Sequence, residues 1–181
     1  MTRCWTSLLA LTLALLTGCA GLAPVAQPEA TARLAGRISI QVEGSGAKGG
    51  AGSAGFELTG GPESGSLGLS TPLGAIAARA QWQPGAARLQ TPEQDREFAD
   101  LDELTRELLG EPIPVAALFA WLRGEPWAAA PAVPVPGGFE QLGWQIDTTR
   151  KAERVLVAKR LAAPAVTLRA RLEEGSDASA P

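Results

Sequence analysis

Residues 109–126 read Leu-Gly-Glu-Pro-Ile-Pro-Val-Ala-Ala-Leu-Phe-Ala-Trp-Leu-Arg-Gly-Glu-Pro, and this stretch divides a chain whose other patterns are mostly those of strands. Pro112 and Pro114 form a rigid break, because neither proline can extend a helix from its N-terminal side. Pro114 also suits the first turn of a new helix. Apolar residues then recur at i, i+3, i+4 and i+7, which predicts a helix over 115–123 that ends at Gly124.

A second helix is predicted just before this break, over residues 100–109. Asp100 is a suitable N-cap, with Glu103 three residues later, and Gly110 is a suitable stop. The leucines at 101, 104 and 108 share one helical face. The two segments together predict a pair of helices joined by a stiff turn.

Strand patterns lie on both sides of the helical pair. In the first of them Ile38, Ile40 and Val42 alternate with polar residues, as in a half-buried strand. Residues 125–138 carry four prolines and are predicted to form a loop. The predicted strands cover residues 36–44, 54–58, 66–70, 75–82, 87–90, 96–99, 139–142, 144–148, 154–159 and 165–172. This order predicts a mainly antiparallel β fold with an inserted helical pair.

The N-terminus has the pattern of a bacterial lipoprotein signal. Arg3 precedes an apolar run, Trp5 to Leu16, which is too short to span a bilayer, and Leu16-Thr-Gly-Cys19 then resembles a lipobox. We expect residues 1–18 to be removed, and Cys19 to carry an N-acyl chain and an S-diacylglycerol. Several acyl chains anchor a protein stably to a membrane, whereas a single acyl chain gives only marginal binding. Residues 19–32 then form a flexible tether, 33–174 a single domain, and 175–181 a disordered tail.

Composition excludes several functions. The chain has no histidine, which removes Ser-His and Cys-His nucleophile pairs and histidine-ligated metal sites. Its formal charge of −3 does not suit nucleic acid. Gly44-Ser-Gly-Ala-Lys-Gly49 matches the spacing of a dinucleotide motif, but more glycine follows, so we expect a flexible hairpin loop through Gly55. We therefore expect neither an enzyme nor a cofactor or metal site.

Three segments resemble the LolB family of outer-membrane lipoprotein receptors. They are Thr71-Pro-Leu-Gly74 between two apolar strands, residues 109–126, and Leu142-Gly-Trp-Gln-Ile-Asp147. Their order and spacing fit the family from about Leu34 to Leu172. The turn Gly-x-Pro-Ile-Pro followed by Leu-x-x-Trp-Leu-x-Gly is the most specific part of the match.

The resemblance implies a fold and a function. The fold is mainly β: an incomplete antiparallel barrel, or half-pipe, covered by a helical lid around an apolar cavity. The cavity would receive acylated lipoproteins from a periplasmic carrier of the LolA type and deliver them to outer-membrane lipid. The protein would be a monomer, lipid-anchored in the outer membrane of a Gram-negative bacterium and facing the periplasm. The residue after Cys19 is Ala20, and not the aspartate that is typical of lipoproteins kept in the inner membrane.

The resemblance also implies roles for individual residues. Pro72 and Gly74 would hold Leu73 in solvent as a membrane-insertion loop, whereas the pattern alone favours a leucine folded back under the hairpin. Trp121 and Trp144 match family tryptophans. The acyl-chain cavity and lid would draw on Ile38, Ile40, Phe56, Leu69, Leu104, Leu108, Leu118, Phe119, Trp121, Leu122 and Trp144. By pattern alone these are also ordinary core residues.

Two other functional classes remain open at the level of sequence. The first is a structural or assembly lipoprotein of the outer membrane with a filled β-core, which an apolar cavity would distinguish from a receptor. The second is a lipid-anchored hydrolase, which the missing histidine disfavours.

Overall fold

The computed structural model describes residues 32–43, 51–109 and 112–176. Its strands form one sheet of 11 strands in the order β6-β5-β4-β3-β2-β1-β11-β10-β9-β8-β7, and every neighbouring pair is antiparallel. The sheet is open, with β6 and β7 as its two edges. The predicted leader (1–18), Cys19, most of the tether, Gly44–Gly49 and residues 177–181 lie outside the described residues.

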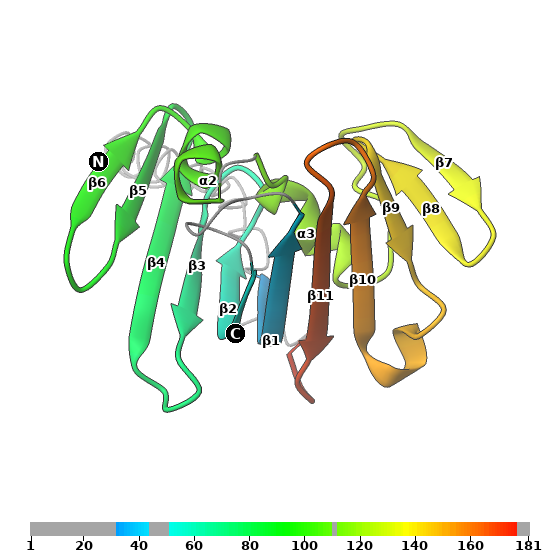
Figure 1. Cartoon of the computed structure of the whole chain (residues 1–181), viewed down its shortest axis with the longest axis horizontal. Helices are drawn as coiled ribbons and strands as arrows, with labels where there is room; N and C mark the ends of the chain where they lie inside the picture. The colour runs from blue at the N-terminus through cyan, green and yellow to red at the C-terminus, as the bar shows by residue number, and fades with distance from the viewer. Residues whose placement is uncertain (1–31, 44–50, 110–111, 177–181) are drawn as a thin grey trace, which may run out of the picture.

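The elements follow the predicted order, with two helices between the two groups of strands (Figure 1). Their bounds are β1 Ala32–Val42, β2 Ala51–Gly60, β3 Gly65–Ser70, β4 Ile76–Gln83, β5 Ala86–Gln90, β6 Asp95–Phe98, α2 Leu101–Leu109, α3 Val115–Trp121, β7 Ala132–Val135, β8 Gly138–Gln141, β9 Trp144–Asp147, a 3₁₀ turn η2 Lys151–Glu153, β10 Val155–Arg160 and β11 Val166–Leu172.

Two local predictions were wrong. Residues 51–55 belong to β2 and not to a loop, because ladder pairing with residues 37–41 of β1 supplies backbone hydrogen bonds that the glycine-rich sequence does not reveal. The proline-rich stretch 125–138 contains β7. This strand accommodates Pro134 because β7 is an edge strand that pairs only with β8. A proline there has no second neighbouring strand to which its missing N–H would have to donate.

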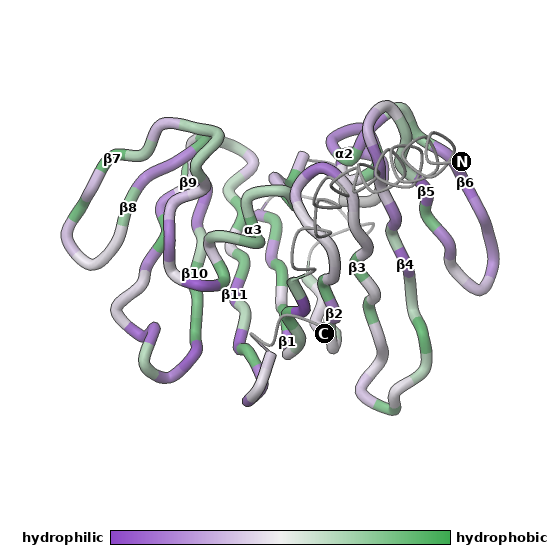
Figure 2. Tube along the Cα trace, turned by 180° about the vertical axis from the view of Figure 1, so that it is seen from behind, coloured by the Kyte–Doolittle hydropathy of each residue, from purple (hydrophilic) through white to green (hydrophobic). Residues whose placement is uncertain are grey.

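One face of the sheet and the helices make up the hydrophobic core. Cross-strand pairs such as Leu58–Leu67 and Phe56–Leu69 lie on this face, as the alternation predicted. Viewed from behind, α3 lies in front of β1 and β11, on the opposite face from the viewer of Figure 1 (Figure 2). Helix α3 therefore lies on the apolar face of the sheet, the face turned away from the viewer of Figure 1.

Candidate functional site

Helix α3 is the centre of the apolar face. Val115, Ala117, Leu118, Phe119 and Trp121 are all buried in a helix of seven residues. Pro114 directly precedes the helix, and Gly124, at φ +71°, ends the turn that follows it. A surface helix buries only one stripe of side chains, so α3 must have protein on several sides.

Aromatic contacts show which strands surround α3. Phe119 meets Trp82 of β4 edge to face, with ring centroids 6.2 Å apart, and Trp121 meets Trp144 of β9 at 6.1 Å. In the sheet order β4 and β9 are six strand spacings apart, which in a flat sheet would be about 29 Å. Phe119 and Trp121 are only two residues apart in α3, which is about 3 Å along the helix axis, yet they contact these two distant strands. The sheet therefore curves around α3.

The side chain of Gln141 in β8 is hydrogen-bonded to the C-terminal end of α3 and to the segment that follows it. Its Oε1 accepts hydrogen bonds from Trp121 Nε1 (2.7 Å) and the Trp127 backbone N–H (2.9 Å). Its Nε2 donates to the carbonyl oxygens of Trp127 (2.8 Å) and Ala130 (2.7 Å). Because Gln141 is only 2% exposed, these four bonds satisfy polar groups that water does not reach.

Helix α2 has the predicted N-terminus. Asp100 Oδ1 accepts the Glu103 N–H at 2.8 Å, and the Glu103 carboxylate accepts the Ala99 N–H at 2.7 Å. Thr105, which is buried, accepts the Ile113 N–H at 3.0 Å while donating to the Leu101 carbonyl. Thr105 thus ties the segment that leads into α3 to α2.

A hollow of about 390 Å³ opens beside the C-terminal end of α3. Apolar side chains from α3's final turn and from β10 and β11 meet cations at this opening. The lining includes Leu122, Val155, Leu156 and Leu172 together with Arg123, Lys151 and Arg154. Its volume lies within the range of small-molecule sites.

The β3–β4 turn holds Leu73 in solvent. Leu73 is 96% exposed, and Ile76 beside it is 60% exposed. Hydrogen bonds between Thr71 and both Gly74 and Ala75 close the turn, and Gly74 has φ +84°. A register shift between Leu69 and Ser70 precedes the turn, and such bulges re-aim a hairpin end.

The residues expected in the cavity or lid meet on the apolar face. Those that are buried are Phe56, Leu104, Leu118, Phe119, Trp121, Leu122 and Trp144, while Ile38, Ile40 and Leu69 are partly buried against them. The side chain of Leu108 and all of Cys19 lie outside the described residues. Burial alone does not separate residues that line a cavity from residues that fill a core.

Three residues of this site were missed in the sequence: Trp82, Thr105 and Gln141. Gln141 did carry a signal, because it is a polar residue two positions after the inward-facing Phe139 of the same strand. Thr105 carried none, since its partner lies across the break.

In the described part of the chain, no group of three histidine, cysteine, aspartate or glutamate side chains could hold a metal. No helix within the described ranges has the length and apolar character needed to cross a bilayer.

Comparison with known proteins gives one consistent family. The sequence model described as "Outer membrane lipoprotein LolB" matches residues 31–173. Proteins named "Outer-membrane lipoprotein LolB" include one from Bordetella petrii, 36% identical over 147 residues (76% of this chain, 74% of the relative). Another, from Chromobacterium violaceum, is 32% identical over 147 residues (77% and 79%), and one from Bordetella parapertussis is 37% identical over 155 residues (78% and 76%).

Proposed function

This chain belongs to the LolB family of outer-membrane lipoproteins, and from that premise we propose how its structure receives and delivers lipoproteins. The family consists of lipoprotein-trafficking receptors and not of enzymes. The chain is accordingly a receptor that takes lipoproteins from a periplasmic carrier and inserts them into the outer membrane.

The acyl chains of the cargo would enter between α3 and the curved sheet. The observation that carries this proposal is the position of α3, an apolar helix held against two distant parts of the sheet by Trp82 and Trp144. The hollow beside Leu122 and Leu156 supports an opening at this end of α3. Since α3 is well buried, admission of a chain requires α3 to shift, which makes it a lid.

The exposed turn at 71–75 would carry out delivery. A fully buried leucine gains roughly 1.5–3 kcal/mol on leaving water, enough for reversible contact with hydrocarbon but not for anchoring. Leu73, held out by Pro72 and Gly74, would touch the bilayer at the moment of release.

Anchoring would come from the lipid on Cys19, with residues 19–32 as the tether. The intact mass of the protein extracted from membranes tests this step. We expect added mass corresponding to a diacylglycerol and an acyl chain, and no such mass for Cys19→Ala. An unmodified mature wild type would contradict the anchoring proposal.

A two-stage transfer assay tests the function itself. A purified acylated lipoprotein is presented on a carrier of the LolA type, and its passage to this protein and then to liposomes is measured. An apolar fluorescent probe that a long-chain amphiphile displaces should also bind. A folded protein that takes neither cargo nor probe would favour a structural lipoprotein with a filled core.

A further inference from the structure

Charge is distributed very unevenly along the folded chain. Residues 150–171, which include β10 and β11, carry seven cations and one acid, a net charge of +6. Residues 91–107, which include β6 and most of α2, carry seven acids and two cations, a net charge of −5. The molecule therefore has a basic centre and an acidic edge although its formal charge is only −3.

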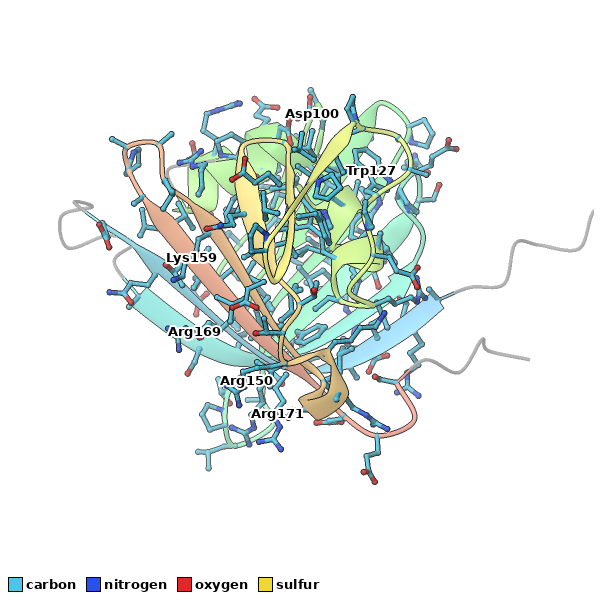
Figure 3. All side chains as sticks on the ribbon, turned by 90° about the vertical axis from the view of Figure 1, so that its right-hand side faces the viewer. Asp100, Trp127, Arg150, Lys159, Arg169 and Arg171 are labelled. Carbon is cyan, nitrogen blue, oxygen red and sulfur yellow. The ribbon has the colours of Figure 1, made fainter. Side chains whose placement is uncertain are left out.

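The basic centre is a row of arginines on the face of the sheet opposite to α3. Arg37 of β1 lies directly opposite Arg171 of β11, and Arg169 is two residues along on the same face. Lys159 of β10 extends the row, and all four side chains are exposed. Lys159, Arg169 and Arg171 lie on the side of the sheet turned away from α3 (Figure 3). Like charges directly opposite one another destabilise a sheet.

Nearby carboxylates only partly offset these cations. Glu153 is bonded to Arg150, which chiefly lowers the pKa of Glu153, with Arg171 as a smaller influence. The pKa of Asp147 is lowered first by hydrogen bonds from Thr149 and less by Lys159. Within the described residues no salt bridge joins Arg37, Arg169 or Arg171 to an acid.

The arginine row leads to the exposed turn. Arg171, Arg37, Gly55 and Ser70 lie side by side across four strands, and Ser70 directly precedes the turn at 71–75. At the usual strand spacing, the Cα atoms of Arg37 and Ser70 are about 10 Å apart. Gly55 contributes no side chain between them. A groove of about 330 Å³ there is lined by the exposed Ile76 and Arg79, by the Arg33–Glu57 ion pair and by Glu173.

We propose that this outer face, defined by Arg37, Lys159, Arg169 and Arg171, docks on the anionic headgroup layer of a membrane while Leu73 enters the hydrocarbon beneath. The inference rests on the proposed function of the turn and adds a docking surface to it. Cations beside an exposed apolar tip match the layering of a membrane surface, where phosphates lie directly above hydrocarbon. An acidic protein partner would use the arginines but would give no reason for the solvent-exposed Leu73 and Ile76 beside them.

The test measures which face of the anchored protein meets the lipid. Full-length acylated protein carrying Ser39→Cys is labelled with a fluorophore and reconstituted into vesicles that contain headgroup-spin-labelled lipid as quencher. Ser39 lies opposite Arg169 on the outer face. The natural cysteines, Cys4 and Cys19, are lost or acylated on the proposed processing. Gln94→Cys, in the acidic segment, provides the control position.

Vesicles of phosphatidylcholine alone are compared with vesicles that also contain phosphatidylglycerol. We expect quenching at position 39, but not at 94, in the anionic vesicles, and its relief by high salt. Changing Arg37, Arg169 and Arg171 together to Gln should lower the ratio of docked to undocked protein about 100-fold, or about fivefold per arginine. The matched control changes Arg88, Arg96 and Arg106 to Gln, which alters net charge equally and should preserve quenching.

Several results would overturn the proposal. The first is that lipid does not quench the label at position 39 of the otherwise wild-type protein. The second is that the Arg37, Arg169 and Arg171 triple variant remains quenched while its circular dichroism is native. The third is that an acidic carrier protein shields position 39 but lipid does not. The last result would assign the face to a protein. Cargo transfer is scored separately, so a wild type that delivers cargo without docking contradicts this inference alone.

Discussion

Leu73 is held in solvent by its neighbours and not by chance. Pro72 stiffens the turn, Gly74 adopts a positive φ, and Thr71 closes the loop through backbone and hydroxyl bonds. Pro72 and Gly74 are visible in the sequence, so a tight turn at this position could be predicted locally. The bulge before it could not, because it depends on how β3 and β4 pair.

We predict that Leu73→Glu separates acceptance of cargo from delivery. The side chain contacts no core, so stability should change by no more than about 0.5 kcal/mol. Incorporation of cargo into liposomes should fall about tenfold or more, because the apolar contact is lost and a carboxylate is costly in hydrocarbon. Val133→Glu, on exposed edge strand β7, is the control and should deliver normally. Loss of the first transfer step would identify Leu73 as a cargo-binding residue instead.

Gln141 is buried, unlike Leu73, and its side chain contributes to the stability of the fold. Truncation in Gln141→Ala would leave the Trp121 indole N–H, the Trp127 N–H and the Ala130 carbonyl oxygen without partners, while the Trp127 carbonyl would keep only the Ala130 N–H at 3.3 Å. We predict a fall of about 2–4 kcal/mol in the free energy of unfolding, measured by urea titration. Gln145→Ala, an exposed glutamine on neighbouring β9, should change it by no more than about 0.5 kcal/mol. Equal effects in the two variants would mean that the buried bonds do not matter.

Elements whose signals are local could be predicted, whereas those that depend on partners could not. Asp100 and Glu103 predicted the N-terminal cap of α2, and both side chains make the capping hydrogen bonds in the structure. The strand period also predicted most strands of the sheet. By contrast, residues 51–55 of β2 became a strand only through β1, and β7 only through β8. The strand order and curvature likewise arise from contacts between segments distant in sequence.

The Thr105 hydroxyl links α2 to the segment that leads into α3. Thr105→Val keeps the shape of the side chain but removes the acceptor of the Ile113 N–H. We predict a loss of about 1–2 kcal/mol in stability and, by hydrogen exchange, loss of protection at the Ile113 amide. Thr105→Ser keeps the hydroxyl and should keep that protection. An Ile113 amide that remains protected in the valine variant would show that α2 does not hold the segment before α3.

At the scale of the whole molecule, an open sheet closes around one short helix. Because α3 contacts β4 on one side and β9 on the other, any guest between α3 and the sheet must displace at least one of these contacts. If cargo enters there, as we propose, binding and packing compete for the same space. A closed form that must open before it binds lowers the apparent affinity by the fraction that is open.

This competition predicts opposite signs for two properties of one variant. Gln141→Ala releases the C-terminal end of α3, so it should bind an apolar fluorescent probe more tightly, by about tenfold, while being less stable. Titration under conditions where circular dichroism shows the variant folded measures the first property, and Gln145→Ala should leave probe affinity unchanged. If Gln141→Ala binds the probe more weakly, α3 is a fixed wall of the site and not its lid, because loosening a wall degrades a preformed pocket whereas loosening a lid exposes it.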